Sequence, residues 1–245
     1  MGDKTWNEKW RRWDECSLCE QDYYGVVRCA LGWACWKTYL GRPEADWARR
    51  LAMGILGIGL RGAKNLEDAL SVQEAELSTE RRNGAPVRQM LDIQSNIANT
   101  YSRLGRFEEA LRLERDVYRG SLRLLGEKHE DTMLAANNYA SSLIIQRSFE
   151  EAKSLLRKML PVARRCLGES KDLSLRMRWT YSKALYADPD ATLDDVREAV
   201  TTLEETARVA RRVFGGANPI TKGIEGTLQK ARANLRAREA SSGGA

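Results

Sequence analysis

Apolar residues recur at helical spacing along most of the chain, and the pattern itself repeats. Between residues 91 and 167 they fall three or four positions apart, as on the buried face of an amphipathic helix. The block FEEA at residues 107–110 returns at 149–152, 42 residues later, and the pair Leu125-Gly126 returns as Leu167-Gly168 at the same offset. This fixed period predicts stacked units, because one helical hairpin cannot bury its own apolar face.

Each unit is expected to hold two antiparallel helices joined by a tight turn, as at residues 104–106. Small residues such as Ala98 and Ala110 fall where the helices must approach closely, and larger ones such as Ile97 and Phe107 are expected to fill the seam. Leu-Gly ends the second helix, since glycine adopts positive φ without steric cost. By the same spacing, Cys166 is predicted to lie in the core.

This unit resembles the tetratricopeptide repeat (TPR) in its 42-residue, kinesin-light-chain-like form. The matching segments are RFEEA at residues 106–110 and LGEKH at residues 125–129, and the resemblance covers roughly residues 47–239. It implies an all-α fold, a TPR-type right-handed helical solenoid of about four helical hairpins with a C-terminal capping helix. The predicted array spans residues 43–240, and residues 241–245 are predicted to be a disordered tail.

The first and last hairpins depart from the repeat pattern. The first, at residues 46–84, carries four glycines in its opening helix (Gly54, Gly57, Gly59 and Gly62), which indicates close helix packing there. The fourth has a turn about five residues longer, after which Thr192 is expected to cap a helix over residues 193–213. A helix from Pro219 to about residue 238 should cover the last exposed seam.

Residues 1–42 form a separate Trp- and Cys-rich segment. Trp6, Trp10 and Trp13 lie at helical spacing, and residues 26–39 read as an aromatic helix that stops before Pro43. Its aromatic face is expected either to cap the first repeat or to remain exposed as a docking surface.

Cys16 and Cys19 form a C-x-x-C pair, which can supply two thiolates to a tetrahedral zinc. With the flanking aromatic residues, the pair resembles the closing zinc ligands of a RING-CH finger, although the six upstream ligands of such a finger are missing. Two interpretations remain open: a zinc-finger remnant, or purely structural thiols. No other cofactor is expected.

Charge and composition narrow the class of protein. The net charge is +6 and the pI about 9.1, which indicates either simple solubility or a preference for acidic partners. Acidic and basic residues are interleaved, so nucleic-acid binding is not expected. We expect no membrane span and no signal peptide, and therefore predict a cytoplasmic protein. The sequence does not specify the oligomeric state. A single histidine, His129, leaves no Cys-His pair or Ser-His-Asp set within reach, so we expect no enzyme.

The function is therefore expected to reside in a surface. In TPR arrays the first helix of each hairpin lines a concave groove, and this resemblance implies that a peptide is bound there. The candidate residues are Arg61 in the first repeat, Ser95, Asn99, Ser102 and Arg103 in the second, Asn137 and Ser141 in the third, and Arg176, Trp179 and Lys183 in the fourth.

Asparagine can bind a peptide backbone whatever its sequence, and the cationic residues would select acidic side chains. The alternatives are a solvated face for the cations, helix–helix hydrogen bonds for Asn137, and interhelix packing for Trp179. We predict a non-catalytic adaptor or scaffold that binds an extended, acidic peptide. The alternative is the substrate-recognition part of a RING-CH-type ubiquitin ligase with a truncated zinc finger.

Overall fold

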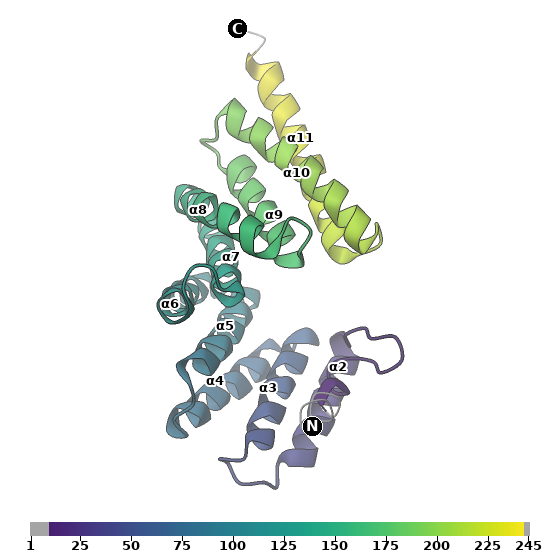
Figure 1. The fold of residues 1–245 in the computed structure, drawn as a ribbon, viewed down its shortest axis with the longest axis vertical. Coiled ribbons are helices and arrows are strands. Elements are labelled where there is room, and N and C mark those ends of the chain that lie inside the picture. The colour runs from purple at the N-terminus through teal and green to yellow at the C-terminus, as the bar shows by residue number, and fades with distance from the viewer. Residues whose placement is uncertain (1–9, 243–245) are drawn as a thin grey trace. The chain divides into compact units, whose positions relative to one another are not determined.

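The computed structural model describes residues 10–242, and this part of the chain is built from helices joined by short turns (Figure 1). The helices are α2 (Gly25–Tyr39), α3 (Trp47–Gly62), α4 (Leu66–Arg82), α5 (Val87–Arg103), α6 (Phe107–Leu125), α7 (Glu130–Ile145), α8 (Phe149–Leu167), α9 (Asp172–Ala187), α10 (Leu193–Phe214) and α11 (Pro219–Ser242). The all-α prediction and the hairpin assignments are confirmed. Two compact units, Met1–Leu113 and Glu114–Ala245, divide the chain within α6.

In the first unit, each helix packs against the next, and α3 also contacts α5. Trp10 is buried with Cys35 and Ile55, and Trp13, Trp36 and Tyr39 pack around them. The aromatic side of α2 therefore covers α3, as expected for a cap. The outer side of α2 is different, since Val26 and Trp33 are exposed. Trp6, the first member of the predicted tryptophan stripe, lies outside the described residues.

Glycines allow α2 and α3 to approach closely. A Cβ on Gly59 would lie 2.9 Å from the carbonyl oxygen of Arg28, and one on Gly32 would lie 3.1 Å from the Cα of Leu56. Both neighbours are backbone atoms, which cannot move aside without shifting a helix. Close packing therefore accounts for part of the glycine content of α3.

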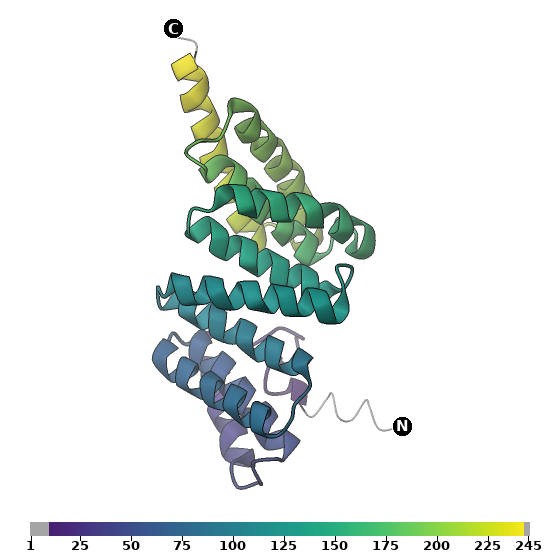
Figure 2. The same cartoon turned by 90° about the vertical axis from the view of Figure 1, so that its left-hand side faces the viewer.

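The second unit continues the same pattern, with α9 packed against both α8 and α10, and with α11 against α9 and α10 (Figure 2). Leu175, Leu203 and Ile224 form its core, so α11 covers the last seam as predicted. Thr192 caps α10 through a reciprocal capping box with Asp195.

Helix ends follow the sequence signals. Gly126 and Gly168 have φ of +80° and +83°, which an L-residue rarely adopts. His129 begins α7, and its Nδ1 accepts the backbone N–H of Asp131 at 3.1 Å. The only histidine of the sequence thus has a structural role as a helix cap.

Two packing predictions were wrong. Cys166 is exposed, because it lies in the last turn of α8 beyond the buried positions Val162 and Ala163. Phe107 keeps 41% of its surface exposed at the very start of α6, while Ala98 and Ala110 are buried as expected. Of the predicted tail, residues 243–245 lie outside the described part.

Candidate functional site

Arg61 and Arg103, predicted to share one face, come together on the neighbouring first helices α3 and α5. Nη1 of Arg61 donates to the carbonyl oxygen and the Oδ1 of Asn96, at 3.1 and 3.2 Å. Nη1 of Arg103 donates in turn to the carbonyl oxygen of Arg61 at 3.0 Å. Burial, and then the nearby charge of Arg103, lower the pKa of Arg61 to about 10. Arg61 therefore stays cationic at neutral pH.

The other candidates of the first unit lie on the same helix, α5. Asn99 is exposed, and its amide donates to the carbonyl oxygen of Ser95 one turn earlier, at 2.9 Å. Ser95 and Ser102 are half-buried. Positions 95, 99, 102 and 103 follow helical spacing, so α5 presents one polar face beside the two arginines.

In the second unit, α7 carries Asn137 and Ser141. Asn137 is 7% exposed, and its Oδ1 has no hydrogen-bond partner among the described residues. Its backbone oxygen accepts the hydroxyl of Ser141 at 2.9 Å. The side-chain acceptor of Asn137 is thus unused within this part of the chain.

Helix α9 brings Arg176, Trp179 and Lys183 onto one side. Trp179 donates from Nε1 to Oγ1 of Thr227 in α11 at 2.7 Å, and Nζ of Lys183 lies 4.0 Å from the centre of its ring. Gly223 of α11 leaves the space that the ring occupies. Burial, and then Lys230, lower the pKa of Lys183. Arg176 is exposed and pairs with Asp172.

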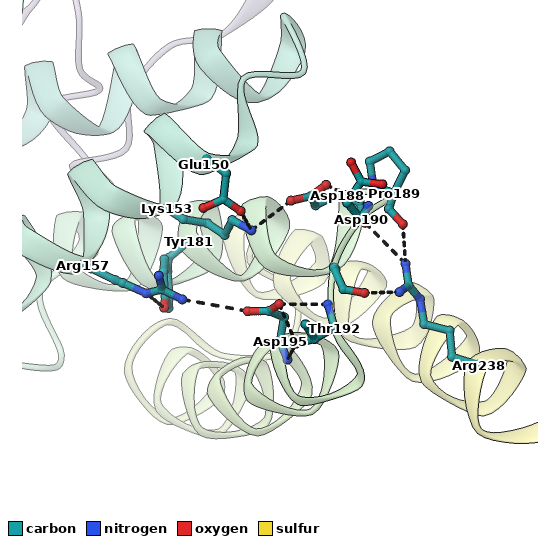
Figure 3. A network of polar contacts seen from close by, with 11 residues as sticks. Glu150, Lys153, Arg157, Tyr181, Asp188, Pro189, Asp190, Thr192, Asp195 and Arg238 are labelled. Carbon is teal, nitrogen blue, oxygen red and sulfur yellow. Dashed lines mark hydrogen bonds and ion pairs between the residues drawn. The ribbon is translucent and has the colours of Figure 1, made fainter. Parts of the chain in front are cut away.

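The long turn between α9 and α10 is held by charged residues from two other helices (Figure 3). Lys153 of α8 donates to Asp188 at 2.9 Å, and both side chains are buried. Burial raises the pKa of Asp188, whereas the hydrogen bonds from Lys153 and from the Asp190 amide lower it. The lowering is larger, and the pKa of Asp188 lies below its ordinary value. Arg238 of α11 donates to the carbonyl oxygens of Asp188 and Pro189.

Next to this turn, Arg157 of α8 donates to the hydroxyl of Tyr181 at 2.9 Å, and that hydroxyl donates to Glu198 at 2.8 Å. Figure 3 shows Arg157 reaching on towards Asp195 at the start of α10. These contacts tie α8, α9 and α10 together at one end of a groove.

That groove, which we call the α8–α10 groove, was missed by the sequence reasoning. It has a volume of about 880 Å³ and lies between α8 and α10, with Ser174, Arg178 and Tyr181 of α9 also lining it. Its residues are spread from 157 to 212 and include parts of three helices. No repeat motif marks such a set, because the surface exists only once the helices have packed.

Cys16 and Cys19 lie in a short loop whose ends pair through the backbone. The amide of Cys16 donates to the carbonyl oxygen of Gln21 at 2.9 Å, and that of Tyr23 to Asp14 at 2.8 Å. Hydrogen bonds from the Leu18 and then the Cys19 amide lower the pKa of the Cys16 thiol. Two thiols supply half of a tetrahedral zinc site, and residues 10–242 bring no three metal-binding side chains together.

Comparison with known proteins identifies the fold. A tetratricopeptide repeat family model matches residues 89–165. BtubC (BKLC) from P. vanneervenii is similar over 89% of this chain and 92% of its own, with a TM-score of 0.65 at 17% identity. The fold is that of a tetratricopeptide-repeat protein.

Two further solved structures are similar to this chain. A Podosopora anserina protein described as a kinesin light chain with nearly identical TPR-like repeats has a TM-score of 0.60 at 15% identity, over 76% of this chain and 87% of its own. The apo form of RapI has a TM-score of 0.58 at 13% identity, over 86% and 78%. No curated protein sequence matches the chain. Within the described residues, no helix is long and apolar enough to cross a membrane.

Proposed function

We propose that this chain is a non-catalytic protein-interaction module that binds an extended, acidic peptide on the first-helix faces of its hairpins. The observation that carries the proposal is the pairing of Arg61 and Arg103 beside the polar face of α5. Arg61 is fixed by Asn96, so its charge is already positioned before a ligand arrives. A preorganised guanidinium loses less side-chain entropy when a carboxylate binds.

The amide of Asn99 adds a contact of another kind. Its internal bond to Ser95 uses one donor, which leaves a second donor and the acceptor for a peptide backbone. Backbone contacts tolerate many sequences, whereas the two arginines favour carboxylates. This combination supports an acidic peptide of otherwise relaxed sequence.

In the second unit, Trp179 and Lys183 offer a different contact. The ring is held by Thr227 and carries the Lys183 ammonium on its face. Such a pair can pack against an apolar side chain while the ammonium contacts a carboxylate. An acidic peptide with apolar residues between its charges fits this surface.

The test is binding of a labelled acidic peptide to the full chain, followed by fluorescence anisotropy. Arg103→Glu is expected to weaken binding about tenfold, since a charge-assisted contact becomes a repulsion. Arg123→Glu, at an exposed position of α6, is the matched control and should change binding by less than about twofold. Equal losses in both variants, or tight binding of a neutral peptide of the same length, would refute the proposal.

The absence of catalysis belongs to the same proposal. His129 is the only histidine of the sequence, and its Nδ1 already accepts the backbone N–H of Asp131 as a helix cap. For the ligase alternative, the deciding measurement is the zinc content of the purified protein.

A further inference from the structure

The α8–α10 groove lies on the side of α9 opposite to the residues proposed above for peptide binding. Successive residues of an α-helix are about 100° apart, so Arg178 is roughly 200° from Arg176. Tyr181 is likewise roughly 200° around the helix from Trp179. Arg178 and Tyr181 line the groove, whereas Trp179 packs on α11. The groove is therefore a separate surface.

Its lining is basic. Five arginines and three glutamates face it, and every glutamate already has a partner. The pairs are Arg164–Glu169 at 2.6 Å, Arg178–Glu205 at 2.6 Å and the Tyr181 hydroxyl with Glu198 at 2.8 Å. Arg208 and Arg212 have no ion-pair partner among residues 10–242, although their neighbour Arg211 pairs with Glu225. Two unpaired cations thus remain near one end of the groove.

The spacing of these two cations suits an extended chain. Arg208 and Arg212 are one turn apart on α10, about 6 Å along its axis. Alternate residues of an extended peptide point the same way and are about 6.6 Å apart. Carboxylates at every second position can therefore reach both arginines at once, without bending the peptide.

The rest of the lining matches a short peptide. Leu160 and Pro161 of α8 and Val209 of α10 offer apolar contacts between the charged residues. Ser174, at the groove's third helix, is 4% exposed, and its Oγ has no hydrogen-bond partner in the part of the chain that the structure describes. The volume lies within the range of ligand sites, far below that of a folded domain.

We infer that the α8–α10 groove is a second binding site, which takes an extended acidic segment of a partner protein. Carboxylates at alternate positions of that segment contact Arg208 and Arg212, and an apolar side chain packs against Leu160 and Val209. One chain then holds acidic segments on two different faces.

The test uses the full chain carrying Arg103→Glu, so that the first-helix site is already weakened, and a labelled synthetic peptide of alternating Glu and Ser with one central Leu. Adding Arg208→Glu and Arg212→Glu to this background is expected to weaken binding about tenfold or more. The matched control is Lys158→Glu, Arg165→Glu, which makes the same charge change at exposed positions of α8 outside the groove. Added to the same Arg103→Glu background, this control should change binding by less than about twofold. Circular dichroism should show the same helix content in all variants.

Each other outcome is informative. Equal weakening in both double variants would mean general attraction by net charge, and would overturn the inference. Equally tight binding of a Gln-Ser peptide would overturn it too. If Arg103→Glu alone weakens binding and the groove substitutions add no further loss, the groove is refuted and the proposed function stands. If the groove substitutions weaken binding but Arg103→Glu alone does not, the proposed function is refuted and the groove stands.

Discussion

Glu76 of α4 is a partly buried carboxyl group packed next to Gly54 of α3, so close that a side chain at that glycine would collide with it. Burial, and then repulsion from Glu80, raise its pKa from 4.5 to about 8. Arg50 lies 2.7 Å from Glu80, so this acidic pair has one cation beside it. A carboxyl group in such a place is neutral when folded at neutral pH.

Glu76→Gln is predicted to stabilise the protein at high pH only. In the folded chain Glu76 holds its proton up to about pH 8, whereas the unfolded chain releases it near pH 4.5. The stability that the protonated Glu76 contributes is therefore fully present below pH 4.5 and is lost as the pH rises towards 8. Urea unfolding should show the variant gaining about 3–4 kcal/mol on wild type between about pH 5 and pH 8.

The exposed Glu108 gives the control for this measurement. Its side chain is 78% exposed and its ion pair with Arg112 is long, at 3.8 Å. Glu108→Gln should therefore change stability by less than about 0.5 kcal/mol at any pH. A Glu76→Gln protein with an unchanged pH dependence would show that the carboxyl group is ionised in the fold.

Cys16 and Cys19 allow a second test at the scale of single residues. Since residues 10–242 offer these two thiols and no third metal ligand beside them, we expect less than stoichiometric zinc in purified full-length protein. Elemental analysis of wild type and of Cys16→Ser gives the measurement. Stoichiometric zinc that Cys16→Ser loses would contradict the prediction and favour the ligase alternative.

Among the elements, the α2–α3 contact depends on glycine. Gly59→Ala would bring a Cβ against backbone atoms of Arg28 and Cys29, at 2.9 and 3.1 Å, so we predict a loss of about 1–3 kcal/mol in unfolding free energy. Gly226→Ala in α11 meets nothing within 4 Å and should instead gain about 0.5–1 kcal/mol. Denaturant melts of both variants compare the two effects, and equal stabilities would refute the packing argument.

The long α9–α10 turn depends on Lys153. Lys153→Met leaves Asp188 buried without its cation, and is predicted to cost about 3–5 kcal/mol. Adding Asp188→Asn should restore much of this, because the amide oxygen can still accept the Asp190 N–H. Arg232→Met, which breaks the exposed pair with Glu204, should cost below about 1 kcal/mol. If the two single variants were equally stable in urea, the turn would not need the buried pair.

The elements were predictable from the sequence because their signals are local. A 42-residue period, glycines after leucine and a Thr-x-x-Asp box mark helix ends directly. The α8–α10 groove was not predictable, since Arg178 and Glu205 become neighbours only through tertiary packing. Cys166 shows why core positions were predicted less well. Helical spacing tells on which side of its helix a residue lies, but not whether another helix extends far enough to cover that residue.

For the molecule as a whole, the charge excess is small beside the number of charges. Lys and Arg number 40 and Asp and Glu 34, and many of them pair between helices, as Arg178 does with Glu205 and Arg232 with Glu204. Paired charges attract a polyanion weakly, because each cation is already partly neutralised. Cations without an ion-pair partner in the part of the chain that the structure describes, such as Arg208 and Arg212, therefore matter more than the net charge of +6.

This distribution predicts poor binding to nucleic acid. We expect generic duplex DNA to bind with a Kd of about 10⁻⁴ M or weaker at physiological salt, with a log–log salt slope below about 3 in magnitude. Fluorescence anisotropy with a labelled random duplex at rising NaCl concentrations measures both. The alternating Glu-Ser peptide serves as the reference ligand in the same buffers. Submicromolar DNA binding with a slope typical of six or more phosphate contacts would mean that the basic residues act together as a nucleic-acid surface, and peptide binding would then need another explanation.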